Sequence, residues 1–318
     1  MSKYIIFVIL IIITVIWVRQ KMLKVINPLK NAFSNELKCK GEKCPAVEPI
    51  DLPPPNMSEW LPHVYDGEVA VYSCYLTNCM IRSIEKKTNI ILPSGVRLLD
   101  SFKIEGGESN FCTIFETTSM KGLKTVWVNC RGSMESIDLE YDIETSSINI
   151  DDNQIRYGNV YIHSGFFKIY NMLLDRVRDV VLSEVDGGGN VVVAGHSLGG
   201  AVATLLGLQL SYYHTTVAVY STASPRIGNS PWASLCNDHG GIWRIVNTVD
   251  LIPTLPLSVT PVKNTLQFYE HGGKLVTFTS NWFSLINNHV IANYFENLYL
   301  NHLDTHIKTS SQNGTKKN

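Results

Sequence analysis

Short apolar runs rich in β-branched residues recur through the middle of the chain. Such runs fit strands that are covered on both faces, as in a parallel sheet. They occupy residues 125–129, 191–194, 216–220 and 242–246. Between the first two runs, apolar residues at three-and-four spacing predict an amphipathic helix. These residues are Phe166, Phe167, Ile169, Tyr170, Leu173, Leu174, Val177, Val180 and Val181.

The order of these patterns predicts the fold class. Strands that alternate with helices favour an α/β fold with a mostly parallel central sheet and helices on both faces. With 318 residues, of which 45% are hydrophobic, the chain can bury a substantial core. Functional side chains in such folds gather at the carboxyl ends of the strands, so the residues that follow each run are the first candidates.

An uninterrupted apolar segment runs from Tyr4 to Val18. As a helix it would rise roughly 22 Å, which is short of the ~30 Å hydrocarbon core of a bilayer unless flanking residues extend it. No small-residue cleavage site follows, because residues 17–20 are Trp-Val-Arg-Gln. We therefore predict a hydrophobic N-terminal helix over residues 1–18, either a transmembrane anchor or a signal segment.

Composition divides the remaining chain into three parts. Residues 19–58 are polar and end in a proline-rich stretch, which predicts a stalk or linker. The strand and helix patterns fill residues 59–303, which we expect to form one folded domain. Residues 304–318 are polar and form the expected tail.

Two sets of residues bear on the compartment, and they favour opposite orientations. Basic residues after the apolar segment outnumber those before it, which by the positive-inside rule argues against export of the domain. Seven cysteines and the sequons at Asn56 and Asn313 favour an oxidising, glycosylating compartment. We expect a chain anchored in a membrane by its N-terminus with the domain luminal or extracellular, or a secreted chain.

The charge balance and the cysteine spacing limit the classes of partner and ligand that the chain is expected to bind. Lys and Arg total 27 against 28 Asp and Glu, so no net basic field favours nucleic acid. No Cys-x-x-Cys motif occurs, and neither a metal site nor a cofactor is indicated. Cys39 with Cys44, and Cys74 with Cys79, are spaced so that each pair could close a local disulfide.

Residues 195–199 form a Gly-His-Ser-Leu-Gly motif between the apolar run 191–194 and a small-then-apolar helix start at Gly200. A strand that reverses sharply into a helix strains the serine backbone and projects its hydroxyl from the sheet edge. The helix N-terminus also favours a developing oxyanion. This context predicts Ser197 as a nucleophile, and the alternative is a glycine-rich turn with an incidental serine.

A serine nucleophile requires a histidine base and a carboxylate that orients the base. In folds of this type the acid follows the nucleophile and precedes the histidine. Asp250 comes directly after the run that begins at residue 242 and is the predicted acid, with a turn-capping aspartate as the alternative. The candidate histidines beyond it are His271, His289, His302 and His306.

Further motifs accompany the Gly-x-Ser-x-Gly motif. They are Val-Asn-Cys-Arg-Gly-Ser at 128–133, His-Ser-Gly-Phe at 163–166, Ser-Pro-Arg-Ile-Gly-Asn at 224–229 and His-Val-Ile-Ala-Asn-Tyr at 289–294. In this order, across about residues 120 to 295, they resemble the class 3, or fungal-type, lipases of the α/β-hydrolase superfamily. The resemblance implies an α/β-hydrolase fold and a lipase-like catalytic domain over residues 59–303.

The resemblance also implies roles for single positions. His289 matches the catalytic histidine, which lies near the C-terminus shortly before an aromatic residue, whereas His271 resembles a separate structural motif on a strand. The backbone N–H groups of Ser133 and Leu198 would form the oxyanion hole. His196 is expected to be a packing residue.

In the family, an amphipathic lid that usually carries a tryptophan follows the Arg-Gly-Ser motif. That position is Leu139 here, and the acidic segment 134–142 has Ile137, Leu139 and Tyr141 as its apolar face. A lid of this kind weakens the expectation of interfacial activation, and polar lids also occur in relatives that act on feruloyl esters.

The leading hypothesis is a serine carboxylester hydrolase that acts on lipid esters, as a triacylglycerol lipase or a phospholipase A1-like enzyme. It would use Ser197, Asp250 and His289 through an acyl-enzyme. Its expected partners are a lipid ester and a membrane or lipid surface, with no obligate protein partner evident. The alternatives are a soluble-ester or feruloyl-type esterase and an inactive hydrolase fold that serves as a binding protein.

Overall fold

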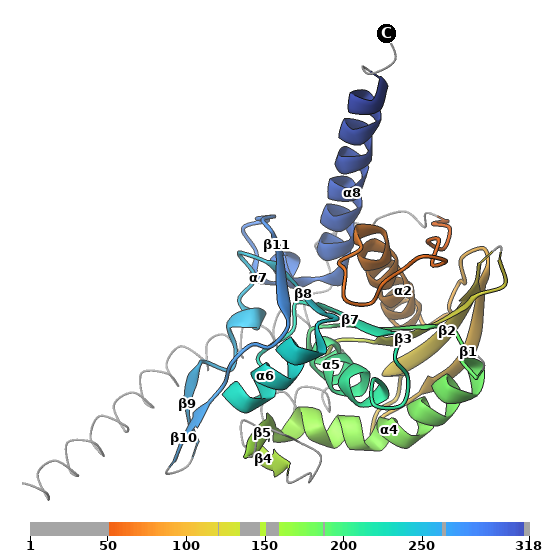
Figure 1. The fold of residues 1–318 in the computed structure, drawn as a ribbon. Helices are drawn as coiled ribbons and strands as arrows, with labels where there is room; N and C mark the ends of the chain where they lie inside the picture. The colour runs from red at the N-terminus through yellow and green to blue at the C-terminus, as the bar shows by residue number, and fades with distance from the viewer. Residues whose placement is uncertain are drawn as a thin grey trace, which may run out of the picture.

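The computed structural model describes residues 51–119, 121–133, 147–150, 159–186, 188–262 and 265–314, with side chains up to residue 302 except that of residue 150 (Figure 1). The expected N-terminal helix, most of the predicted stalk and the lid residues Ile137, Leu139 and Tyr141 lie outside this part of the chain. Among the helices of the described residues, none is long and apolar enough to cross a membrane.

Seven of the described strands form the central sheet, in the spatial order β1, β2, β3, β6, β7, β8, β11. They are β1 (Val96–Phe102), β2 (Cys112–Thr118), β3 (Lys124–Cys130), β6 (Asn190–His196), β7 (Val217–Thr222), β8 (Ile242–Asn247) and β11 (Lys274–Phe278). β1, β2 and β3 are antiparallel neighbours, and every pair from β3 to β11 is parallel. The four predicted strands are confirmed as β3, β6, β7 and β8, the buried centre of the sheet.

Helices cover both faces of this sheet (Figure 1). Helices α4 (Ser164–Glu184) and α5 (Leu198–Leu210) pack on one face, and α2 (Gly67–Glu85) and α8 (Ile291–Gly314) pack on the other. Alternate residues of β6 point to the two layers: Val191 and Val193 belong to the core of α4 and α5, and Val192 and Ala194 to that of α2 and α8. Strand β6 needs apolar residues at successive positions because helices cover both faces of the sheet there.

Smaller elements connect these layers. Helix α6 (Ser230–His239) follows β7, and a 3₁₀ turn, η1 (Ile252–Thr254), follows β8. Two antiparallel pairs, β4 with β5 and β9 with β10, lie outside the central sheet. Their bounds are β4 (Ser147–Ile150), β5 (Val160–His163), β9 (Val259–Val262) and β10 (Thr265–Phe268). The short helix α7 (Leu285–His289) comes directly before α8.

The folded part extends past both predicted domain boundaries. Met57 is only 2% exposed, and Asn190 Nδ2 donates to the Met57 carbonyl oxygen at 3.1 Å. Packing therefore begins before residue 59, within the predicted stalk. At the other end, α8 continues to Gly314 through most of the predicted polar tail.

The suggested local disulfide between Cys74 and Cys79 is wrong, because both thiols are free. Both residues lie on α2, five positions apart. At about 100° per residue, side chains at that spacing point about 140° apart and cannot reach each other. Cys39 and Cys44 lie outside the described residues.

Candidate active site

Ser197 lies at the turn from β6 into α5. Its backbone has φ 57° and ψ −128°, a region that non-glycine residues avoid. The turn is held by a hydrogen bond from Ser197 N to the Thr222 carbonyl oxygen at 2.9 Å, which ties it to the neighbouring strand β7. Strain of this kind persists only where the surrounding structure enforces it.

The glycines on either side of Ser197 have a steric cause. A Cβ added at Gly195 would lie 2.2 Å from the Gly199 carbonyl oxygen, and one added at Gly199 would lie 2.1 Å from the Arg131 carbonyl oxygen. Real Cβ atoms do not approach so closely. The turn therefore requires glycine at both positions, and it packs directly against the chain that leaves β3.

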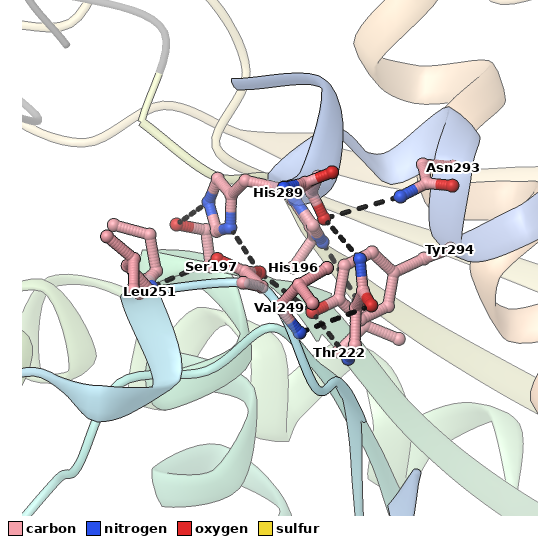
Figure 2. Close-up of polar contacts among 12 residues, drawn as sticks. His196, Ser197, Thr222, Val249, Leu251, His289, Asn293 and Tyr294 are labelled. Atoms are coloured by element: carbon pink, nitrogen blue, oxygen red, sulfur yellow. Dashed lines mark hydrogen bonds and ion pairs between the residues drawn. The ribbon is translucent and has the colours of Figure 1, made fainter. Parts of the chain in front are cut away.

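The fold brings Ser197, His289 and Asp250 into one hydrogen-bonded chain (Figure 2). His289 Nε2 lies 2.9 Å from Ser197 Oγ, and His289 Nδ1 lies 2.7 Å from Asp250 Oδ2. Because an ionised carboxylate only accepts, Nδ1 carries the proton and Nε2 accepts from the serine hydroxyl. All three side chains are buried. In the sequence, His289 lies 92 positions after Ser197 and 39 positions after Asp250, so the fold brings distant residues together.

The carboxylate of Asp250 is held by two further donors. Asp250 Oδ1 accepts from the backbone N–H of Ile252 at 2.9 Å, and Oδ2 accepts from the Tyr294 hydroxyl at 2.7 Å. The same hydroxyl accepts from the backbone N–H of Asn247 at 3.0 Å. Burial raises the pKa of Tyr294 well above its ordinary value, and the charge of Asp250 adds to this effect. The phenol therefore stays protonated and donates to the acid.

Buried asparagines fix the segment that carries His289, here called the histidine arm (residues 279–294). Asn247 Nδ2 donates to the carbonyl oxygens of Ser280 at 2.8 Å and Asn288 at 3.0 Å. Asn293 Nδ2 donates to the same Asn288 oxygen at 3.3 Å. Sequence reasoning missed these residues and the role of Tyr294, although Tyr294 is the aromatic residue of the histidine motif.

His196 packs against the histidine of this chain without joining it. The two ring centroids are 4.9 Å apart. His196 Nδ1 lies 3.1 Å from Thr222 Oγ1, and that hydroxyl donates its proton to the Gly195 carbonyl oxygen, so it accepts from His196. Burial and the neighbouring His289 lower the pKa of His196 well below its ordinary value. A neutral, hydrogen-bonded ring agrees with the expected packing role.

His271 lies elsewhere and has a different partner. Its Nε2 is 2.6 Å from the Pro253 carbonyl oxygen, in a loop that follows an isolated β-bridge at Glu270 and is not part of a strand as expected. Burial and then the nearby Arg244 lower the pKa of His271 to about 4. His271 therefore bonds a backbone carbonyl oxygen in η1, whereas His289 bonds the carboxylate of Asp250.

Of the two residues expected to form an oxyanion hole, Leu198 directly follows the nucleophile and Ser133 directly follows Gly132, which lies against it. A Cβ added at Gly132 would be 3.1 Å from Ser197 Cβ, so the chain passes over the serine just before Ser133. Leu198 starts α5, where the first N–H groups have no acceptor within the helix. Buried Arg131 fixes the segment, because its Nε donates to the Asn110 carbonyl oxygen and its Nη1 to that of Gly132, both at 2.8 Å.

Residues 127–260 match the sequence profile of the family described as Lipase (class 3). The matched stretch contains the strained serine turn and the acid. Over this stretch, which is less than half of the chain, the sequence is similar to the class 3 lipases. In the part of the chain that the structure describes, no group of three or more His, Cys, Asp or Glu side chains is arranged to hold a metal ion.

Three curated relatives illustrate the sequence similarity. Secreted mono- and diacylglycerol lipase A of Penicillium cyclopium is 35% identical over 96 residues, 29% of this chain and 32% of that protein. Secreted mono- and diacylglycerol lipase 1 of Fusarium solani is 30% identical over 118 residues, 36% and 35% of the two chains. Phospholipase A(1) DAD1 of Arabidopsis thaliana is 33% identical over 107 residues, 30% and 24%. The match thus spans about a third or less of each relative.

Solved structures share the fold at low identity. The native Rhizomucor miehei lipase propeptide complex gives a TM-score of 0.53 at 19% identity, over 76% of this chain and 79% of that one. A triacylglycerol lipase whose catalytic centre is described as a serine protease triad also gives 0.53, at 20% identity, over 69% and 83%. At these identities the likeness shows the fold alone, which is the α/β-hydrolase fold of these lipases.

Proposed function

We propose that the chain is a serine carboxylester hydrolase that acts on lipid esters, either acylglycerols or phospholipids. The observation that carries this proposal is the continuous chain of hydrogen bonds from Ser197 Oγ through His289 to Asp250. A hydroxyl is a weak nucleophile at neutral pH, and an imidazole oriented by a carboxylate is the means by which such hydroxyls are activated.

In the proposed acylation step, Ser197 Oγ attacks the ester carbonyl carbon while His289 Nε2 takes the hydroxyl proton. Asp250 Oδ2 accepts from His289 Nδ1, which keeps the ring in the tautomer that presents a basic nitrogen to the serine. The tetrahedral intermediate then expels the alcohol, which receives the proton from His289. The product of this step is an acyl-Ser197 ester.

The negative charge on the former carbonyl oxygen needs fixed donors. The backbone N–H groups of Leu198 and Ser133 are proposed for this role, since one starts α5 and the other follows the segment that crosses Ser197. Donors of this kind typically contribute about 3 kcal/mol each to lowering the barrier. In deacylation, water attacks the acyl carbon while His289 Nε2 accepts a proton from it. The bond from that carbon to Ser197 Oγ then breaks, His289 returns the proton to Oγ, and the fatty acid leaves.

The relatives support a lipid ester as the substrate class. Two are named mono- and diacylglycerol lipases and one is named a phospholipase A1. The two fungal relatives are named as secreted, and Asn56 of the first sequon is exposed, which supports a luminal or extracellular domain. For residues 1–18 the proposal has two forms: a segment that anchors the chain in the membrane, or a signal segment that is removed.

A lipid-class hydrolysis panel tests the proposed function. The full chain and its Ser197→Ala variant are assayed on triacylglycerol, diacylglycerol, phosphatidylcholine and a soluble short-chain ester. We expect turnover of at least one long-chain lipid ester and none by the variant. Turnover of the soluble ester alone would favour the soluble-ester alternative that the acidic segment 134–142 suggests. Equal turnover by both proteins would refute the assignment of the nucleophile.

A further inference from the structure

We propose that Trp282 and Phe283, in the loop of residues 281–284, form a fixed anchor that inserts into an uncharged lipid surface beside the catalytic site. The inference rests on the proposed function, because it assigns the surface that delivers the lipid ester to Ser197. It goes beyond that function by naming the protein residues that contact the surface. The anchor is separate from the lid segment 134–142.

The loop is exposed, aromatic and free of charge. Phe283 is 94% exposed and Trp282 is 44% exposed, which is an unusual state for neighbouring large aromatic side chains. The sequence from Leu275 to Phe295 contains no Asp, Glu, Lys or Arg. Phenylalanine and tryptophan favour the boundary between water and acyl chains, while charged groups oppose insertion. This composition fits a zwitterionic lipid surface.

Phe283 is held outward by a strained and braced backbone. Its φ is +54°, a conformation that bulky residues rarely adopt, and its N–H donates to Asn281 Oδ1 at 2.9 Å. Trp282 N donates to Asn288 Oδ1 at 2.8 Å, and Trp282 Nε1 donates to Asn293 Oδ1 at 3.0 Å. Both of these asparagines are buried. Strain maintained to expose an apolar ring points to a function for that ring.

The loop and the catalytic histidine belong to one continuous element. Ser284 caps α7 by accepting from Asn287 N, and α7 ends at His289. Phe283 lies six positions before His289, and the last five of these positions form α7. Asn288, which accepts from Trp282 N, directly precedes the histidine. A surface that contacts Phe283 is therefore held next to the catalytic site.

A second loop of the site also exposes an apolar side chain. Leu251, which is 40% exposed, directly follows Asp250. Apolar side chains are thus exposed next to the acid and on the segment that leads to the base. A water-soluble substrate would gain little from such exposure, whereas an insoluble ester has to pass from a lipid surface to Ser197.

Substitution of Phe283 by Ala tests the anchor through the choice of substrate. Losing one inserted aromatic ring corresponds to about a tenfold or greater loss of surface affinity. We expect the apparent KM for an emulsified long-chain glyceride to rise by about that factor. We expect kcat/KM for a soluble short-chain ester to stay unchanged, and Phe283→Trp to retain the wild-type KM on the emulsion.

Tyr212→Ala is the matched control, because Tyr212 is a 54% exposed aromatic residue just beyond the end of α5 that is opposite Ser197. Tyr212→Ala should change neither the apparent KM on the emulsion nor kcat/KM on the soluble ester. Equal emulsion kinetics for Phe283→Ala and Tyr212→Ala would overturn the anchor. Equal losses by Phe283→Ala on both substrates would also overturn it, because the ring would then act within the site. Absence of wild-type turnover on both esters would instead refute the proposed function.

A spectroscopic test does not depend on activity. In the full-length Ser197→Ala background, 4-cyanophenylalanine is incorporated in place of Phe283, and phosphatidylcholine vesicles are added. We expect the nitrile stretch to move from its water value towards its value in an apolar solvent. The same probe at position 212 should not change. If the protein sediments with the vesicles while the nitrile stretch at position 283 stays unchanged, insertion of the ring is contradicted. A shift that only a protein partner causes would also overturn the proposal, because the loop would then bind a protein.

Discussion

The two ends of the proposed catalytic relay, the serine end at Ser197 and the histidine end at His289 and Asp250, are built in different ways. At the serine end, backbone packing sets the geometry: Gly195 and Gly199 leave no room for a Cβ, and Ser197 adopts a strained conformation between β6 and α5. At the histidine end, side-chain hydrogen bonds set it, through Asn247, Asn288 and Tyr294. The first end carries a local sequence motif, whereas the second depends on side chains that are distant in sequence. Substitutions should therefore damage the two ends in different ways.

The largest effect is expected at Asp250, which orients His289. Asp250→Asn retains the shape of the side chain but no longer favours a proton on the nitrogen of His289 that faces it. We expect kcat to fall about 10⁴-fold for a soluble ester, with the folded state retained. Steady-state kinetics and circular dichroism measure the two quantities. Asp179→Asn, at an exposed position of α4, should leave kcat unchanged; similar kinetics for the two variants would contradict the assigned role of Asp250.

Gly199→Ala should break the serine end through packing. The added Cβ would meet the Arg131 and Cys130 carbonyl oxygens at 2.1 and 2.4 Å, so the backbone has to move. We expect the free energy of unfolding to fall by about 3 kcal/mol and activity to be lost. Chemical denaturation measures this. Gly67→Ala is the control, because its Cβ would meet nothing closer than 3.6 Å. Equal stability of the two variants would remove the steric account of the motif.

Tyr294→Phe should weaken the histidine end without unfolding it. The substitution removes the donor to Asp250 Oδ2 and the acceptor of the Asn247 N–H. We expect kcat on a soluble ester to fall about tenfold at unchanged KM, and stability to fall by about 1 to 2 kcal/mol.

Tyr220→Phe separates the positioning effect from simple destabilisation. It removes a buried hydroxyl that accepts from the Asp66 N–H at 3.3 Å, at the start of α2. It should lower stability without lowering kcat. If Tyr294→Phe behaves in the same way, Tyr294 is structural and does not position the acid.

The smallest effect concerns His271, which lies outside the relay. Its folded pKa of about 4 is below its ordinary value of 6.5. As the pH falls from about 6.5 to 4, the unfolded chain gains a proton that the folded chain does not, so stability decreases. His271→Gln keeps a donor for the Pro253 carbonyl oxygen and should make the fall in Tm between pH 7 and 5 shallower. An unchanged slope would contradict this assignment, and kcat at neutral pH should not change.

The same contrast explains what could be predicted from the sequence. The central strands and α4 were predicted because apolar runs and helical spacing follow directly from burial on two faces. Ser197 was predicted because its strained turn needs glycines at fixed positions. In each case the sequence signal lies within a few residues of the feature that it predicts.

The parts that were missed depend on contacts between distant segments. Nothing near Tyr294 in the sequence shows that its hydroxyl reaches Asp250, and nothing near Asn247 shows that its amide holds Ser280 and Asn288. Met57 precedes the predicted domain start at residue 59 and lies in a proline-rich stretch, where nothing local shows that it is buried and bonded to the distant Asn190. The choice of His289 over His271 came from the family resemblance, since both follow Asp250 in the chain.

The central claim is that Ser197 is a nucleophile activated by His289, and labelling by a fluorophosphonate probe tests it most directly. The folded full-length chain is treated at neutral pH, and the modified residue is located by mass spectrometry. We predict one equivalent of probe on Ser197 and a loss of labelling in His289→Ala. A folded wild-type protein in which Ser197 remains unmodified would contradict the account.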